Sequence, residues 1–245
     1  MADSTSFIRP AVEAFKSGTL QMATSPSQGS VISYEWGEYP VNIALVVASV
    51  FFFLFFLDSF LHCNPTVLSC LTRWRNNYRL ESSVPLVRSR NWTFASCILP
   101  FCLIAARFNF FDIDFITQQP AEYRTPFYIG VFLAFMLLRF VIYKVIRPMH
   151  GSMETYRIAH RSAMNFFIPY TILMLVTIGV LRIFHLGPDT ARTVLLCETG
   201  AVYLVYLFTK LEILGSSYGV LTTFLYLCGL ELLPAAALTG AIMWL

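Results

Sequence analysis

Five ionisable side chains lie within apolar stretches of the sequence, and their presence there requires a chemical reason. They are Asp58, Arg107, Arg139, Glu198 and Glu231. An ionisable group at the centre of a membrane helix costs about 2.5–3.5 kcal/mol on insertion scales, so such groups usually face protein or water. Two kinds of chemistry would suit them: interhelical ion pairs that fix packing, or a path that conducts protons or anions.

The depth of each group, counted from the helix ends, suggests partners. Asp58 and Arg139 fall at similar depths in the inner half, whereas Arg107 and Glu198 both fall near the outer face. The packing interpretation therefore pairs Asp58 with Arg139, and Arg107 with Glu198. The transport interpretation places Glu231 and Arg139 on a proton or anion path. Transport paths usually bring polar lining, broken helices and a clear repeat, and the polar lining here is thin, which favours packing.

Glu231 is the charged residue that packing explains least well. It falls near the midplane, three residues before Pro234. Proline lacks an N–H, so the carbonyl of Leu230 loses its usual donor. Because an isolated carboxylate is costly there, Glu231 must be protonated, paired or in contact with water. We expect it to face the bundle interior, towards Arg139 or another polar group.

The elements that position these residues are predicted from long apolar runs. The chain has 245 residues, of which 57% are hydrophobic and 13% charged, whereas a soluble domain carries about 25% charged residues. Backbone polar groups must be paired within lipid, so runs of about 20 apolar residues must be helices. We predict an all-α, polytopic integral membrane protein, a bundle of six transmembrane helices at about 41–62, 92–111, 126–146, 163–184, 193–212 and 219–245.

The distribution of basic residues predicts the orientation of these helices. Loops 63–91 and 147–162 are rich in arginine, whereas the other loops carry little lysine or arginine. Basic loops stay on the cytoplasmic side. We therefore expect a polar N-terminal tail (1–40) outside, followed by a transmembrane domain (41–245), with the N-terminus and the C-terminus both periplasmic.

The first cytoplasmic loop is predicted to hold an amphipathic helix at about 64–80. Asn64 and Pro65 are residue types that begin helices. Apolar residues then recur at helical spacing while basic residues point elsewhere: Val67, Leu71, Trp74 and Tyr78 against Arg73, Arg75 and Arg79. Helices of this kind tend to lie in the membrane interface. The segment would anchor the topology, recognise lipid headgroups or dock a partner.

Several functional classes receive no support from the sequence. It contains no GxSxG, HExxH or glycine-rich phosphate motif, so we expect no enzyme activity and no cofactor. The six cysteines lack CxxC spacing and the four histidines are scattered, so no metal site is predicted. The net charge of +3 is spread along the chain, so no nucleic acid partner is expected.

The last predicted helix reads TTFLYLCGLELLPAAAL and follows TKLEILGSSYG. Its FLYLCxLExLP pattern resembles a Bacteroidota membrane family catalogued as domain of unknown function 4271, and the likeness covers about residues 40–245. The matching positions are Tyr226, Cys228, Glu231 and Pro234. The family has no assigned reaction. The resemblance implies a bacterial inner (cytoplasmic) membrane protein.

Two functional hypotheses follow. The first is a non-enzymatic inner-membrane scaffold or accessory subunit of a cell-envelope assembly, with the lipid bilayer and other membrane or envelope proteins as partners. The alternative is a small transporter or lipid-handling membrane protein that uses Glu231. A cavity at Glu231 would favour the alternative, and lateral protein contacts around a dry bundle would favour the scaffold.

Overall fold

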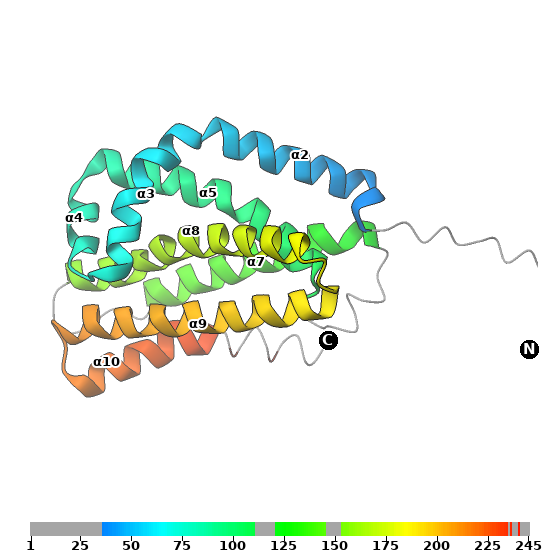
Figure 1. Ribbon diagram of the computed structural model, residues 1–245. Helices are drawn as coiled ribbons and strands as arrows, with labels where there is room; N and C mark the ends of the chain where they lie inside the picture. Colours follow the sequence, from blue (N-terminus) through cyan, green and yellow to red (C-terminus); the bar gives the residue numbers. More distant parts are fainter. Residues whose placement is uncertain (1–35, 111–120, 146–152, 235, 237–239, 241–245) are drawn as a thin grey trace, which may run out of the picture. The chain divides into compact units, whose positions relative to one another are not determined.

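The computed structural model describes residues 36–110, 121–145, 153–234, 236 and 240, and every regular element in these ranges is a helix (Figure 1). In chain order the elements are η1 (Trp36–Glu38), α2 (Pro40–Phe55), α3 (Leu57–Thr72), α4 (Asn76–Ser82), α5 (Val84–Arg107), α7 (Ala121–Val145), α8 (Met153–Ile183), α9 (Pro188–Gly215), α10 (Val220–Leu227) and η2 (Cys228–Leu232). The predicted all-α class is confirmed for these residues. The N-terminal tail predicted at 1–40 lies outside them, apart from 36–40.

Three helices are long and apolar enough to cross a membrane: α7, α8 and α9. They correspond to the segments predicted at 126–146, 163–184 and 193–212. Helices α2 and α3 pass the same test together, but are bent by 71° at their junction. The fold is therefore that of a membrane protein with three or four candidate spans, and the predicted bundle of six spans is not confirmed.

The other two predicted spans differ from the observed helices for separate reasons. The span expected at 92–111 lies in α5, which begins at Val84 and carries Arg88, Arg90 and Asn91 in its first half. These polar residues lower the mean hydropathy of the helix. The span expected at 219–245 begins as α10 and η2, an apolar stretch over Val220–Leu232 that is short for a crossing. Of the residues after Pro234, only 236 and 240 are described.

The bend between α2 and α3 alters the first predicted span, 41–62. Helix α2 ends at Phe55, and α3 starts at Leu57 with Asp58 in its first turn, where a carboxylate interacts favourably with the helix dipole. Helix α3 then packs against α5 and α8. The turn takes the polar residues Asp58, His62 and Asn64 out of the direction of α2.

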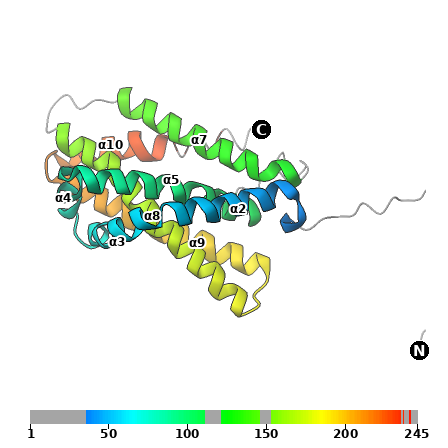
Figure 2. The same cartoon turned by 90° about the horizontal axis from the view of Figure 1, so that it is seen from above.

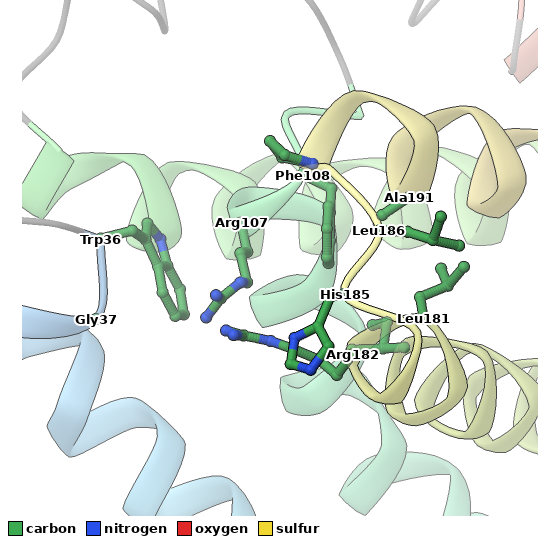
Figure 3. A pocket seen from close by; sticks show the side chains of 11 residues that line it. Trp36, Gly37, Arg107, Phe108, Leu181, Arg182, His185, Leu186 and Ala191 are labelled. Carbon is green, nitrogen blue, oxygen red and sulfur yellow. The ribbon is translucent and has the colours of Figure 1, made fainter.

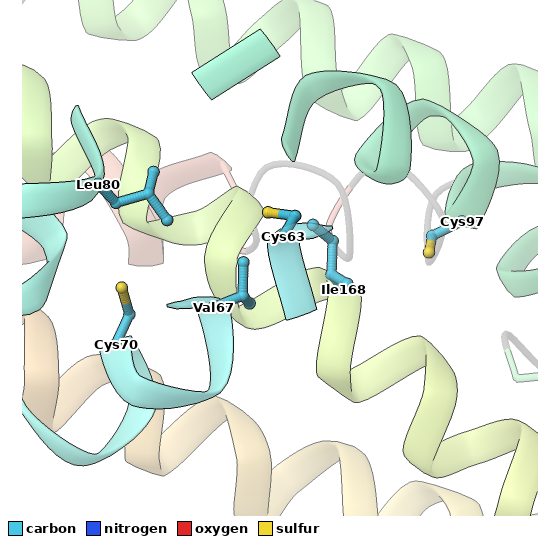
Figure 4. Packing of buried hydrophobic residues seen from close by; sticks show 6 residues of the cluster. All are labelled: Cys63, Val67, Cys70, Leu80, Cys97 and Ile168. Atoms are coloured by element: carbon cyan, nitrogen blue, oxygen red, sulfur yellow. The ribbon is translucent and has the colours of Figure 1, made fainter. Parts of the chain in front are cut away.

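The helix predicted at 64–80 is corrected by the structure: the segment is divided between α3 and α4. Asn64 and Pro65 do not begin a helix, because both lie within α3. Val67 is fully buried in a cluster with Cys63, Cys70, Leu80, Cys97 and Ile168 (Figure 4). Trp74 and Tyr78 pack on a second cluster that includes Ile158, Ile213 and Tyr218. The apolar stripe therefore faces protein, while Arg73, Arg75 and Arg79 are exposed.

Polar contacts fasten α4 to the neighbouring helices. Glu81 forms ion pairs with the buried Arg90 of α5 and with Arg161 of α8, the latter at 2.6 Å. Asn165 Nδ2 donates to Asn77 Oδ1 at 2.8 Å, and the hydroxyl groups of Tyr78 and Thr155 are 3.0 Å apart. This short helix is thus an integrated part of the bundle.

Helix α8 is the central element of the bundle, as it packs against α9, α5, α3 and α4 (Figures 1 and 2). Helix α7 packs against α5, and it also contacts η2. The segment α10–η2 in turn packs on α9 through α10. The segment α10–η2 therefore packs against both α7 and α9, and Glu231 lies in this segment.

Candidate functional site

A buried charged cluster surrounds Glu231. Its Oε1 accepts a hydrogen bond from Arg139 Nη2 at 2.6 Å and one from the Tyr206 hydroxyl at 2.7 Å, and it forms an ion pair with Lys210 Nζ. Arg139 Nη2 also donates to the Tyr206 hydroxyl, at 2.7 Å. We refer to these four residues as the Glu231 cluster. The predicted orientation of Glu231 towards the interior and Arg139 is present.

Three separate elements bring the cluster together. Arg139 comes from α7, and Glu231 comes from η2. Tyr206 and Lys210 are four residues apart on α9, so helical periodicity places them on one face. Their Nζ–OH distance is 3.3 Å. The polar contacts of the cluster therefore link α7 and α9, the two helices against which η2 and α10 also pack.

Glu231 lies in a π-helical turn that the sequence did not predict. Its widened hydrogen-bond pattern includes the Leu233 N–H, which bonds the Cys228 carbonyl five residues back. One extra residue in a turn rotates the side chains that follow it, and such turns are frequent at functional sites. Pro234 follows directly and cannot donate a backbone hydrogen bond. The wide turn therefore accommodates the proline while directing Glu231 at Arg139 and Lys210.

The cluster contains more cationic than anionic groups. The side chains of Lys210 and Glu231 are 1% and 5% exposed, and that of Arg139 is 11% exposed. A buried ion pair is stable only with good geometry and further hydrogen bonds, and both are present here. With all three groups ionised, however, two cations share one carboxylate. One positive charge is left without a matching anion in the cluster.

A cavity of about 270 Å³ borders the cluster. Helices α7, α8 and α9 contribute most of its lining, together with Phe101 of α5 and Glu231 of η2. Its lining is mainly aromatic and comprises Phe101, Phe132, Phe135, Arg139, Ala163, Phe166, Phe167, Tyr170, Thr199, Val202, Tyr203, Tyr206 and Glu231. We call it the aromatic cavity. It combines a large apolar surface with one charged edge.

Polar groups remain available at this charged edge. Arg139 uses only Nη2 in the cluster, so within the described part of the chain Nε and Nη1 have no acceptor. The same holds for Oε2 of Glu231, because all of its described bonds go to Oε1. The hydroxyl of Tyr203, which also lines the cavity, is buried with no hydrogen-bond partner.

Three of the predicted charged residues lie away from this site. Asp58 is exposed at the start of α3. The guanidinium of Arg107 lies over the Trp36 ring, 5.5 Å from its centroid. Glu198 of α9 has Oε1 buried without a hydrogen-bond partner. Among the described residues, the expected ion pairs Asp58–Arg139 and Arg107–Glu198 are therefore not formed, since Arg139 pairs with Glu231 instead.

A second cavity, of about 520 Å³, lies at the opposite end of α5 and α8 from α4. Figure 3 shows Arg107, Arg182 and His185 directed towards its interior, with Trp36 on the facing side. His185 has a backbone φ of 51°, a conformation that is uncommon outside glycine. This cavity includes Arg107, one of the predicted residues, but none of the Glu231 cluster.

Lys210 and Tyr206 are the site residues that sequence reasoning missed. Both lie in the segment predicted to span the membrane at 193–212, but neither was among the predicted charged candidates. The available signal was their spacing of four residues on one helix. Depth alone could not reveal that both face Glu231, because this depends on how α9 is rotated.

The described residues contain no group of three histidine, cysteine, aspartate or glutamate side chains arranged to hold a metal ion. Comparisons of the chain with family models, with curated proteins and with solved structures gave no match. The function must therefore be inferred from the geometry of the site.

Proposed function

We propose that this protein is a non-enzymatic, multi-pass membrane protein that binds an amphiphilic ligand inside its helical bundle. The observation that carries this proposal is the aromatic cavity at the edge of the Glu231 cluster. Binding pockets for small molecules are typically apolar, with a few converging polar groups that fix orientation. This cavity has that composition, and it lies among α7, α8 and α9, the three helices that could each cross a bilayer.

The lining of the cavity favours a lipid-like ligand over an inorganic ion. A path for protons or small anions requires polar groups or water along its length. Here, phenylalanine and tyrosine rings make up eight of the thirteen lining residues, and Arg139 and Glu231 are the two charged ones. An acyl chain suits the aromatic wall, and a polar head suits the edge. This arrangement supports the lipid-handling hypothesis, in which Glu231 helps to position the ligand.

The test is to identify what the full chain retains when it is extracted from native membranes in polymer-bounded discs. Bound lipids would be measured by mass spectrometry in the wild type and in Ala163→Phe, which places a ring into the aromatic cavity. Ala201→Phe is the matched control, because Ala201 is exposed on α9. We expect one lipid class to be enriched in the wild type and the control, and lost in Ala163→Phe. Equal lipid content in all three would contradict the proposal.

A second candidate is an accessory subunit of a cell-envelope assembly. The observation that favours it is the apolar face of α2, where Val47, Phe51 and Phe55 are all more than 60% exposed. Either lipid or a partner helix could cover this face. The same purification tests the candidate, since a stoichiometric protein that disappears with Phe51→Ala and Phe55→Ala would identify a partner surface on α2.

We also propose that the chain crosses the bilayer six times, with both termini periplasmic, in a Bacteroidota inner membrane. The cellular assignment rests on the resemblance of the final segment to the Bacteroidota family. The orientation is supported by the basic residues of 63–91, of which Arg73, Arg75, Arg79 and Arg88 are exposed around α4. In this arrangement the bend between α2 and α3 lies at or near the cytoplasmic surface of the membrane. Helix α5 makes the second crossing.

A further inference from the structure

We propose that the aromatic cavity binds a long-chain carboxylate, and that Arg139 holds its head group. This inference rests on the proposed function and specifies the chemistry of its ligand. Three features of the described residues carry it: the excess cation in the Glu231 cluster, the unused donors of Arg139, and the buried hydroxyl of Tyr203.

The excess cation is the first feature. Glu231 accepts from Arg139, Tyr206 and Lys210 through one oxygen atom. One carboxylate can neutralise only one of the two cations. A positive charge left uncompensated in a membrane interior is costly, and a single bound anion would remove this cost. Arg139 and Glu231 line the cavity and Lys210 does not. An anion bound in the cavity would therefore meet the cluster at Arg139.

The donors at the cavity edge are the second feature, and they suit a carboxylate. Arg139 Nε and Nη1 have no acceptor among the described residues, because both hydrogen bonds of the guanidinium come from Nη2. These two nitrogens do not share an edge of the guanidinium, so a carboxylate would accept one charge-assisted hydrogen bond, from either of them. Tyr203 lines the same cavity, and its hydroxyl is buried without a partner, so a small movement of this side chain would supply a second donor. An unsatisfied buried hydroxyl is otherwise destabilising.

The balance of charge and space distinguishes a carboxylate from a phosphate ester. A carboxylate brings one negative charge, which equals the excess of the cluster. A phosphate monoester brings up to two charges, which exceeds the single excess charge of the cluster, and a larger number of acceptors. The cavity of about 270 Å³ with its phenylalanine wall accommodates one acyl chain rather than two. A single-chain carboxylate meets both conditions.

The experiment uses the full chain in phosphatidylcholine nanodiscs and a diazirine-bearing palmitate as the photolabel. Peptide mapping by mass spectrometry should place the label on α7, α8 or α9 at residues that line the cavity, such as Phe132 or Val202. The competitors are unlabelled palmitate, hexadecanol and hexadecyl phosphate, which share the chain and differ in the head. We expect palmitate to compete at least about tenfold better than hexadecanol, which is the value of one charged hydrogen bond.

Two charge variants are expected to change the preference for palmitate over hexadecanol in opposite directions. Lys210→Met removes the excess cation without touching the cavity wall, so the preference for palmitate over hexadecanol should fall towards unity. Glu231→Gln increases the excess, so this preference should rise by about tenfold. Because either variant could perturb folding, its thermal midpoint is measured in parallel, and palmitate should raise the midpoint of Glu231→Gln more than that of Lys210→Met.

The outcomes separate this inference from the proposed function. If hexadecanol competes as well as palmitate while Ala163→Phe abolishes labelling, an amphiphile binds but its charge is not recognised, and the inference fails alone. If hexadecyl phosphate competes better than palmitate, the carboxylate assignment is wrong. If neither charge variant alters the preference, the excess cation has no role. If no label reaches the cavity, both proposals fail.

Discussion

At the scale of single residues, Glu231 is the shared acceptor that makes a charged cluster tolerable inside an apolar bundle. Its Oε1 accepts hydrogen bonds from the guanidinium of Arg139, the ammonium of Lys210 and the phenol of Tyr206. Removing one member of a buried ionic group leaves the others uncompensated, which costs more than the pair contributed. The residues of the cluster should therefore respond non-additively to substitution.

We expect Glu231→Gln to destabilise the protein by about 3–5 kcal/mol, because it leaves Arg139 and Lys210 buried without a counter-charge. Lys210→Met alone should be nearly neutral, since Glu231 and Arg139 still form a complete pair. The double variant should recover much of the loss. Thermal unfolding of the purified chain, followed by size-exclusion chromatography, measures all three. Strictly additive effects would show that the residues do not act as one cluster.

The sequence predicted part of this site. Charge, depth and Pro234 directed attention to Glu231 and indicated Arg139 as a partner. The π-helical turn could not be predicted, because it depends on how the end of the chain fits between α7 and α9. The pairing of Asp58 with Arg139 was wrong, because depth places two residues in one layer but does not determine whether their helices are neighbours. The rotation of each helix about its axis is determined by its packing against the other helices, which the sequence pattern does not give.

At the scale of elements, α4 shows how a basic loop can be incorporated into a bundle. Glu81 lies between Arg90 and Arg161, and its side chain is 7% exposed while that of Arg90 is 1% exposed. Asn77 and Asn165 pair beside it. Sequence alone favoured an interfacial helix, because a stripe with Trp74 and Tyr78 suits the membrane interface and the surface of a neighbouring helix equally well. The apolar stripe does not say which surface covers it.

Glu81→Gln should loosen α4, because Arg90 would remain buried without its counter-charge. We expect backbone amides in Asn76–Ser82 to exchange hydrogen at least about tenfold faster, with a loss of stability of about 3 kcal/mol. Hydrogen exchange with mass spectrometry provides the measurement. Arg88→Gln is the control, since Arg88 lies in the same helix as Arg90 but is exposed. Equal protection of α4 in both variants would show that packing alone holds it.

The bounds of the elements followed the apolar runs where these runs are uninterrupted. The predictions at 126–146, 163–184 and 193–212 coincide with parts of α7, α8 and α9. In lipid a long apolar run must form a helix, because its backbone polar groups have to be paired within the segment. The prediction failed at 41–62, where polar residues after Phe56 allow the chain to turn. A run that is apolar in its first half and mixed in its second does not specify whether one straight helix or two bent ones form.

At the scale of the whole molecule, arginines concentrate at the end of the bundle that holds α4. Arg73, Arg75, Arg79 and Arg88 are exposed there, and Arg157 joins them at the start of α8. The other end holds Arg107 and Arg182 beside the second cavity. Arginine-rich segments near the ends of membrane helices remain in the cytoplasm. In the proposed topology, the aromatic cavity would lie within the bilayer, between the α4 end and the second cavity.

This arrangement predicts which residues an impermeant thiol reagent can reach. Ser82 at the end of α4 and Asp189 at the start of α9 are both exposed, and the proposed topology places them on opposite sides of the membrane. In a Cys197→Ser background, which removes the one exposed native thiol among the described residues, Asp189→Cys should be labelled in intact spheroplasts. Ser82→Cys should be labelled only after the membrane is opened. The reverse pattern would invert the topology and place the α4 end, with its exposed arginines, in the periplasm. Labelling of both in intact spheroplasts would mean that the chain crosses the membrane an even number of times between Ser82 and Asp189, and the assignment of six spans would have to be abandoned.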